Sequence, residues 1–377
     1  MNRPETLLIV ADSERDANML YATGLFVPDP FIYLKTRGRP LIVMSDLEID
    51  RARAQAPHCR VASLNAYQQK LRARGIKRPG LAQVVRRILR EKGIRRVIVP
   101  DDFPLGLATD LEKLGVKVRA RPGTFFPERE IKSPAEVRKI SAALMMAEVG
   151  MAEGMEVLRR AKIGRDRKLI HHGVPLTSER LRAVIDCAIL QASGLAANTI
   201  VAGGRQACDP HERGYGPLRA NELIIIDIFP RSQKTGYFGD ITRTVVRGRA
   251  SEAARKLYHT VFQGQKIAFT KIRAGAPTAG VHRAVQRFFE QQGYRTGRRK
   301  GRMEGFFHGT GHGLGLEIHE APRMGATSTG RLQPGHVVTV EPGLYYPEIG
   351  GVRLEDVALV TTNGARNLTR FEKVLEI

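Results

Sequence analysis

The first part of the chain alternates between short apolar runs and segments whose apolar positions have helical spacing. Thr6–Ala11, Phe31–Lys35 and residues 95–100 are short runs rich in aliphatic residues, which is typical of strands. The segment Leu81–Lys92 instead places its aliphatic residues on one face of a helix. This alternation predicts an α/β domain with a mostly parallel or mixed sheet over residues 1–126.

The pattern changes after this domain. Pro122-Gly123 and Pro127 interrupt the chain, as turn and loop residues do. Ser133-Pro134-Ala135-Glu136 then has the order of a helix start: an N-cap serine, a proline at the first helical position and a glutamate that completes a capping box. We therefore predict a second domain over residues 127–377 that opens with a long helix.

Two pairs of strand-like runs in this second part carry acidic residues. Asp227 and Asp240 occupy one pair, and Glu341 and Glu355 occupy the other, with turn residues between the runs of each pair. Folding the first pair into a hairpin would bring its two aspartates face to face. Acidic side chains are almost never fully buried unless they are paired or bound to a metal. The pattern therefore predicts clustered acids that a pair of divalent metal ions neutralises.

A glycine- and histidine-rich segment, Phe307–Pro322, lies between the two acidic pairs. It contains His308, His312 and His319, and its alternate glycines each cost about 1 kcal/mol in a helix relative to alanine. The segment therefore favours extended or irregular backbone that passes close to another part of the molecule. Neutral imidazole is a common metal ligand and proton carrier. Taken alone, the segment also fits a surface loop with incidental histidines.

Strand alternation separates the charged neighbours of Glu355. Side chains two positions apart in a strand share a face, so Arg353 is expected beside Glu355. Asp356 is expected on the opposite face. We therefore place Arg353 in the site and Asp356 outside it.

These motifs together resemble the metal site of the pita-bread metallopeptidases, a group that includes methionine aminopeptidase, aminopeptidase P and prolidase. The similarity rests on the two aspartates, the histidine of HGTGH, the glutamate of VEPG and the glutamate of VRLED, and it extends from about residue 131 to the C-terminus. The first domain is similar in pattern to the N-terminal domain of aminopeptidase P, prolidase and creatinase. The resemblance implies an α+β pita-bread catalytic domain preceded by a smaller, creatinase-like α/β domain.

The resemblance also implies a role for each residue. Two divalent ions per chain are expected, manganese foremost and cobalt, zinc or iron as alternatives, with Asp240 and Glu355 bridging them. The metal ligands implied are Asp227, Asp240, His312, Glu341 and Glu355. The catalytic residues expected are Glu341, His319 and His308, with Glu341 carrying the proton of the attacking water and His319 stabilising the developing oxyanion. The residues expected to face the substrate are His211, His308, His319 and Arg353.

The activity implied is hydrolysis of the bond between an N-terminal residue and proline, as in aminopeptidase P or prolidase. HGTGH, EIHE, VRLED and the N-terminal domain favour that branch over methionine aminopeptidase. Two alternatives stay open: a peptidase with methionine aminopeptidase-like specificity, and a binding or chaperone module without peptidase activity. The chain departs from the family in the spacing of its aspartates, 240 − 227 = 13, about two residues longer than usual, and in IDIFP, which replaces an IDLG-type sequence.

Composition limits the setting in which the protein works. No apolar stretch reaches the roughly 20 residues that span a bilayer, and the N-terminus lacks the pattern of a signal peptide. The cysteines, Cys59, Cys187 and Cys208, are few and far apart, which argues against a disulfide framework. We therefore expect a cytoplasmic protein without a membrane partner, and a homodimer.

The net charge of +23 raises the question of a nucleic-acid partner. The densest basic run, Arg295–Arg302, has one neighbouring aromatic residue, Tyr294, and no repeated stacking pattern. A solvated loop and an anion-binding patch both fit this run. We favour the solvated loop and expect no nucleic-acid partner.

Overall fold

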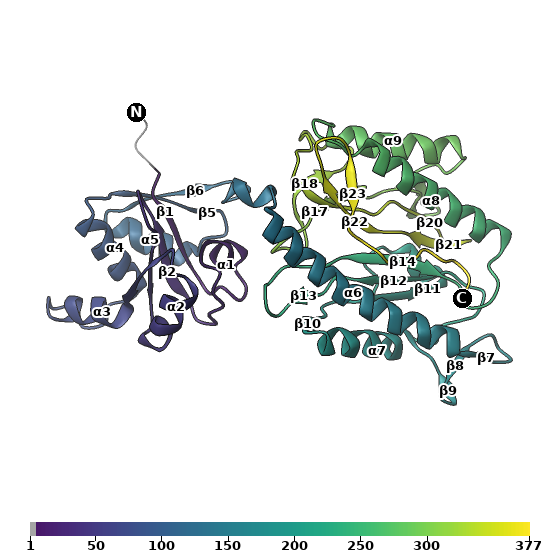
Figure 1. Ribbon diagram of the computed structural model, residues 1–377, viewed down its shortest axis with the longest axis horizontal. Helices are drawn as coiled ribbons and strands as arrows, with labels where there is room; N and C mark the ends of the chain where they lie inside the picture. Colours follow the sequence, from purple (N-terminus) through teal and green to yellow (C-terminus); the bar gives the residue numbers. More distant parts are fainter. Residues whose placement is uncertain (1–4) are drawn as a thin grey trace. The chain divides into compact units, whose positions relative to one another are not determined.

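The computed structural model describes residues 5–377 (Figure 1). The chain forms two compact units, which divide after Arg129, and each is described by itself below. Within residues 5–377, no helix combines the length and the apolar character needed to cross a membrane.

The first unit contains a mixed six-stranded sheet in the order β4-β3-β2-β1-β5-β6. Its strands are β1 (Leu7–Ala11), β2 (Phe31–Lys35), β3 (Leu41–Met44), β4 (Arg60–Ser63), β5 (Arg96–Pro100) and β6 (Lys117–Arg121). β2 is antiparallel to both β1 and β3, whereas β4 and β5–β6 join through parallel pairs. The mixed sheet predicted from the alternating pattern is therefore confirmed.

Helices cover this sheet on both faces. They are α1 (Ala17–Thr23), α2 (Ile49–Gln55), α3 (Leu64–Arg72), α4 (Leu81–Glu91) and α5 (Leu105–Lys113). Successive residues of β1 enter different cores: Leu8 packs in the cluster that contains the apolar face of α4, and Ile9 packs in the cluster that contains α1. Both faces of β1 are thus buried, which explains its continuous apolar run.

The second unit begins with a long helix, α6 (Pro134–Arg160). The Ser133 hydroxyl accepts the Glu136 N–H, and the Glu136 carboxylate accepts the Ser133 N–H, so the predicted capping box forms. Three further helices follow: α7 (Ser178–Gln191), α8 (Glu252–Lys271) and α9 (Thr278–Gln291).

Two sheets of this unit position the candidate site. One has the order β11-β12-β14, and the other β18-β17-β19-β22-β23. Helix α6 packs on the first sheet, and α8 and α9 pack on strands of the second half of the unit (Figure 1). The strands are β11 (Ile200–Gly203), β12 (Ile224–Ile228), β14 (Ile241–Val245), β17 (Gly311–Gly313), β18 (Glu320–Met324), β19 (Val337–Val340), β22 (Asp356–Val360) and β23 (Ala365–Asn367).

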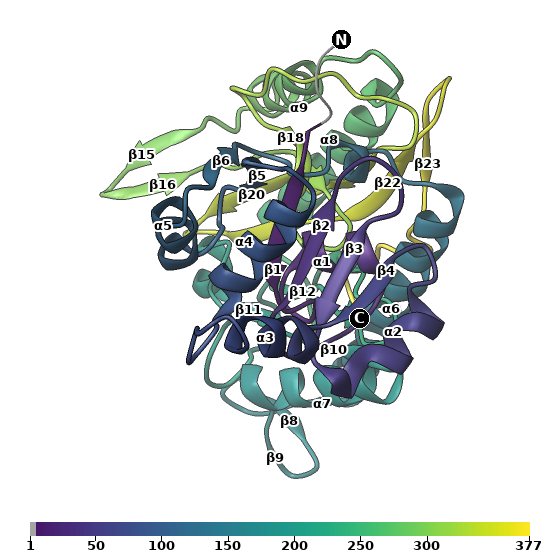
Figure 2. The same ribbon diagram turned by 90° about the vertical axis from the view of Figure 1, so that its left-hand side faces the viewer.

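Small two- and three-stranded sheets complete the unit. They are formed by β7 (Lys162–Ile163), β8 (Leu169–His171) and β9 (Val174–Pro175), by β10 (Gly194–Leu195) with β13 (Arg231–Ser232), by β15 (Gly297–Arg299) with β16 (Arg302–Glu304), and by β20 (Gly343–Tyr346) with β21 (Gly350–Arg353). Figure 2 shows β15–β16 extending away from its neighbours in the unit. The basic run predicted as a loop is therefore a hairpin, with the left-handed residues Lys300 and Gly301 at its turn.

Candidate active site

The two aspartates lie at the end of one strand and just before the next. Asp227 is in β12, and Asp240 directly precedes β14. The antiparallel register pairs Asp227 with Thr242, so Asp240 lies diagonally two positions away and on the same face. The prediction that the aspartates face each other directly was therefore wrong in register, although both carboxylates lie on one side of the sheet.

The two glutamates also lie at strand ends. Glu341 follows β19, and Glu355 lies between β21 and β22. The Glu355 N–H donates to the Thr242 carbonyl at 3.0 Å, and the Thr242 hydroxyl donates to Glu355 Oε2 at 2.7 Å. These contacts join the end of β21 to β14 and bring acids more than 100 residues apart in the sequence to one place.

The glycines of HGTGHG allow close packing around His312. A Cβ on Gly311 would lie 2.0 Å from the Thr339 carbonyl oxygen, and one on Gly313 would lie 2.1 Å from that of Ala321. Only glycine fits at either position, which confirms the expectation of close backbone approach. His312 Nδ1 lies 3.1 Å from the Gly313 carbonyl oxygen, to which it donates. Its Nε2 therefore keeps a lone pair that points at the acids.

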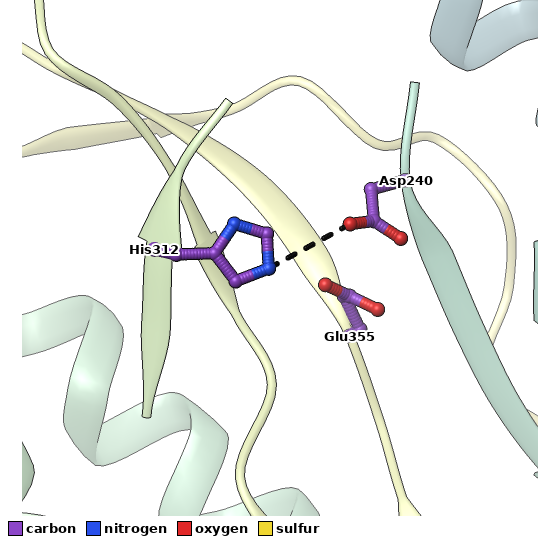
Figure 3. Close-up of side chains that lie close together, drawn as sticks. All are labelled: Asp240, His312 and Glu355. Carbon is purple, nitrogen blue, oxygen red and sulfur yellow. Dashed lines mark ion pairs between the residues drawn. The ribbon is translucent and has the colours of Figure 1, made fainter. Parts of the chain in front are cut away.

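Asp240, His312 and Glu355 form a compact cluster (Figure 3). One ligand atom from each residue lies within 4.8 Å of the other two. His312 Nε2 is 3.9 Å from Asp240 Oδ2 and 3.2 Å from Glu341 Oε1. The three side chains come from separate strands and point toward a common centre.

Two of the buried acids each have one carboxylate oxygen without a partner. Asp227 Oδ1 and Glu355 Oε1 are both buried without a hydrogen-bond partner. Burial, reinforced by the neighbouring carboxylates, raises the pKa of Asp240 and of Glu355 well above the usual range. A buried acid without a partner is costly. Divalent cations would supply the missing partners, so this donor set of carboxylates and one imidazole fits the metal ions expected from the sequence.

Arg353 connects one acid to a hydrogen-bonded chain. Its Nη2 donates to Asp227 Oδ2 at 2.7 Å, and its Nη1 donates to the Tyr345 hydroxyl at 3.0 Å. That hydroxyl lies 2.9 Å from His308 Nε2, and His308 Nδ1 lies 2.8 Å from the Gly309 carbonyl oxygen. Because the Tyr345 hydroxyl accepts from Arg353, it donates its own hydrogen to His308 Nε2, and His308 Nδ1 donates to the Gly309 carbonyl. Both ring nitrogens of His308 are therefore already engaged in hydrogen bonds.

Three histidines that line the cavity differ in how exposed they are to solvent. Burial lowers the pKa of His308 to about 4, and it also lowers that of His319 to about 4, with the neighbouring His312 adding to the effect. Both are therefore neutral near pH 7. His319 keeps surface exposed to solvent, but its ring is partly covered where it stacks edge-on to His312, with ring centroids 4.4 Å apart. His211 is likewise exposed.

One cavity of about 970 Å³ brings all of these residues together. The sequence-predicted residues that line it are His211, Asp227, Asp240, His308, His312, His319, Glu341, Arg353 and Glu355. Asp356 is not among its lining residues. Other lining residues were not predicted: Asn198, Ile200, Arg213, Phe229, Phe307 and Arg323. Apart from the unusual IDIFP sequence, none of these carries a signal that marks a site before the chain is folded.

A network of buried ionic side chains lies on the side of Glu355 that faces away from the cavity. Arg243 donates to Asp356 Oδ1 at 3.0 Å and to the Glu355 carbonyl at 2.6 Å. Asp356 also accepts from Lys373 and from Asn367. No feature of the sequence marks Arg243, which lies within an ordinary strand pattern.

The sequence profile described as metallopeptidase family M24 matches residues 138–362. A Xaa-Pro dipeptidase of Pyrococcus horikoshii is 30% identical over 287 residues, which cover 75% of this chain and 76% of that protein. An uncharacterised peptidase of Bacillus subtilis, YqhT, is 32% identical over 257 residues, or 63% of this chain and 70% of that one.

Solved structures show the same fold. An X-Pro aminopeptidase of Thermotoga maritima superposes with a TM-score of 0.82 at 20% identity, covering 99% of this chain and 98% of that one. A dipeptidase of Pyrococcus horikoshii superposes with a TM-score of 0.80 at 27% identity, covering 99% of this chain and 95% of that one. The expected pita-bread architecture is thereby confirmed.

Proposed function

The chain belongs to metallopeptidase family M24, and from this premise we propose that it hydrolyses the bond between an N-terminal residue and a following proline. The family makes it a hydrolase that works with divalent metal ions. The observation that carries the proposal is the cavity of about 970 Å³ in which acids, imidazoles and Arg353 converge. The Pyrococcus horikoshii relative named Xaa-Pro dipeptidase supports the substrate class.

Five residues would hold the metal ions: Asp227, Asp240, His312, Glu341 and Glu355. Asp240 and Glu355 would bridge two ions, and carboxylate-rich ligation favours manganese, with cobalt, zinc or iron as alternatives. When bound, such ions supply an activated water and polarise the scissile carbonyl.

The protein's own side chains would manage the protons. Glu341, whose Oε1 lies 3.2 Å from His312 Nε2, would accept the proton of the attacking water and deliver it to the proline nitrogen, which leaves as a secondary amine. His319, neutral and exposed to the cavity, would donate an N–H to the developing oxyanion. His308 would shape the pocket through its ring, because both of its nitrogens are occupied.

Cationic side chains favour a dipeptide. Arg213 and Arg323 are exposed and line the cavity, and Arg323 lies opposite His312 across the β17–β18 pair. A guanidinium pairs well with a carboxylate, and only a dipeptide ends in a free carboxylate directly after proline. We therefore propose prolidase-type activity.

A substrate panel tests this function. The metal-loaded protein is assayed with Xaa-Pro dipeptides, Xaa-Pro-Xaa tripeptides and Met-Ala peptides, with manganese, cobalt or zinc. Hydrolysis of the dipeptides is expected. Turnover of the tripeptides alone would indicate an aminopeptidase P, and turnover of Met-Ala alone would reject the proline specificity. No turnover of any peptide would favour a binding module.

We also propose a cytoplasmic homodimer. Cys59, Cys187 and Cys208 are all free thiols, which suits a reducing compartment. Met145 and Leu190 are exposed apolar residues on α6 and α7, and burying them against a second copy would remove them from water. Light scattering after size-exclusion chromatography would give the mass of the dimer, and a monomer mass would reject this proposal.

A further inference from the structure

The candidate site has an apolar side that the metal chemistry does not use. Phe229 lies two residues after Asp227 and lines the same cavity. Ile200 also lines it, and the β11–β12 register pairs Ile200 directly with Asp227. Phe307 lines the cavity as well and packs against the cluster that contains Ile200. An acid and three apolar side chains therefore form one wall.

The chain holds Phe229 in place. The Gly239 N–H donates to the Pro230 carbonyl at 3.0 Å, which closes the loop that follows β12. Beyond it, β13 pairs with β10, and the Tyr237 hydroxyl donates to Glu136 on α6 at 2.8 Å. A Cβ on Gly239 would lie 2.5 Å from the backbone of Ala143, so the loop also packs tightly on α6. Because both sides of the loop are anchored, the backbone that carries Phe229 is held beside the cavity.

The orientation of a substrate follows from charge. The ammonium group of an N-terminal residue is attracted to the acids, whereas a carboxylate is attracted to Arg323. The side chain of the N-terminal residue would then lie near Asp227, beside Ile200 and Phe229. Contact with an apolar wall favours an apolar side chain and disfavours a charged one.

We propose that Phe229 is a specificity-determining residue that, with Ile200 and Phe307, forms an apolar subsite for the side chain of the substrate's N-terminal residue. This inference rests on the proposed Xaa-Pro peptidase function. It names the preferred substrates as those with a large apolar first residue, such as leucine, methionine or phenylalanine. Glycine-first substrates leave the wall without a contact, and lysine- or aspartate-first substrates bring an unpaired charge against it.

The first test compares kcat/KM for Leu-Pro and Gly-Pro in wild type and in Phe229→Ala. The wild type is expected to favour Leu-Pro, and the variant to lose about tenfold of that preference, since one hydrophobic contact supplies discrimination of this order. Phe229→Leu, which keeps an apolar wall, is expected to retain most of it. An unchanged ratio in Phe229→Ala would overturn the inference.

A matched control separates recognition from folding. Phe238 lies in the same loop and is partly exposed like Phe229, but it does not line the cavity. Phe238→Ala is expected to leave the Leu-Pro to Gly-Pro ratio unchanged, whatever it does to stability. If both variants lower kcat/KM equally for every substrate, Phe229 only supports the loop and the inference is wrong.

A binding measurement decides the matter without turnover. Calorimetric titration of free leucine and free glycine into the metal-loaded protein is expected to show tighter leucine binding in wild type and little difference in Phe229→Ala. If no Xaa-Pro peptide is cleaved, the proposed function fails, yet a leucine preference that depends on Phe229 would still support the subsite. Equal binding of leucine by both proteins, or none, would overturn it.

Discussion

Glu355 and Asp356 are neighbours in sequence and are equally buried, but their surroundings are opposite. Glu355 faces the cavity, where its Oε1 has no partner and burial raises its pKa. Asp356 faces away from it, and its carboxylate accepts from Arg243, Asn367 and Lys373. The first acid is destabilised within the protein alone, and the second is fully compensated. A buried carboxylate oxygen without a partner, with other carboxylates nearby, indicates a cation ligand, whereas a buried acid with basic partners indicates a structural role.

This contrast also shows how the fold serves the site. The compensated network on one side joins β14, β22 and the C-terminal segment through Arg243, which donates to the carbonyls of Phe371 and Glu372 as well as to Asp356. The uncompensated acids on the other side are attached to the same strands. Rigid packing behind the site keeps like charges close together in front of it, where the side chains alone would move apart.

The largest effect is expected when a bridging acid is neutralised. Asp240→Asn should lower kcat/KM at least about a thousandfold, because the water and its proton acceptor lose their positions. The same change should raise the melting temperature of the metal-free protein, since it removes a buried charge that other carboxylates repel. Steady-state kinetics measures the first effect, and calorimetry with and without metal, together with elemental analysis, measures the second. If metal-free Asp240→Asn is less stable than metal-free wild type, the clustered carboxylates do not destabilise the protein.

Asp356→Asn should lower the stability of the protein and leave its metal binding unchanged, the opposite of Asp240→Asn. Removing the charge leaves the buried Arg243 and the partly buried Lys373 without this counterion, which is expected to destabilise the protein by about 3–5 kcal/mol. Metal content per folded chain should stay close to the wild-type value. Urea unfolding gives the free energy, and Glu348→Gln is the control because its pair with Lys300 is exposed. Loss of metal from folded Asp356→Asn would show that the two faces are not independent.

The sequence predicted the chemistry of the site better than its geometry. Asp227, Asp240, His312, Glu341 and Glu355 were selected because acids within β-branched runs and histidines among glycines are unusual, and the comparisons confirm the family that they indicated. The diagonal register of the aspartates was missed because strand ends are not fixed by local pattern. Tyr345 and Thr242 were missed because hydroxyl groups are common in strands, and their roles depend on contacts with residues far away in the sequence.

His336 tests whether every buried atom without a partner marks a functional site. It lies outside the cavity, its Nδ1 accepts the Gln333 N–H at 3.0 Å, and its Nε2 is buried without a partner. Burial, assisted by the charge of Lys132, lowers its pKa from 6.5 to about 4. The unfolded chain therefore takes up this proton first, so stability is expected to fall as the pH drops from 6.5 toward 4, by about 2–3 kcal/mol.

Removing the imidazole checks the sign of this effect. His336→Asn keeps an acceptor for the Gln333 N–H but cannot titrate, so its unfolding free energy should change less between pH 6.5 and 4 than that of wild type. His259 is exposed, and His259→Asn should leave the pH dependence as it is. Equal pH dependence in wild type and His336→Asn would show that this unpartnered atom has no energetic consequence.

The smallest effect is expected at the basic hairpin β15–β16, where charges are exposed and in part already paired. Lys300 pairs with Glu348 at 2.9 Å and Arg302 with Asp209 at 2.6 Å, and such surface pairs contribute little. Changing Arg298, Arg299 and Lys300 to alanine should leave both kcat/KM and stability within error. A salt-dependent fall in kcat/KM for acidic peptides would instead show that the hairpin attracts substrate. Loss of nucleic-acid binding in this variant, where wild-type affinity falls with salt at a slope of about −0.9 per phosphate contact, would show a polyanion partner.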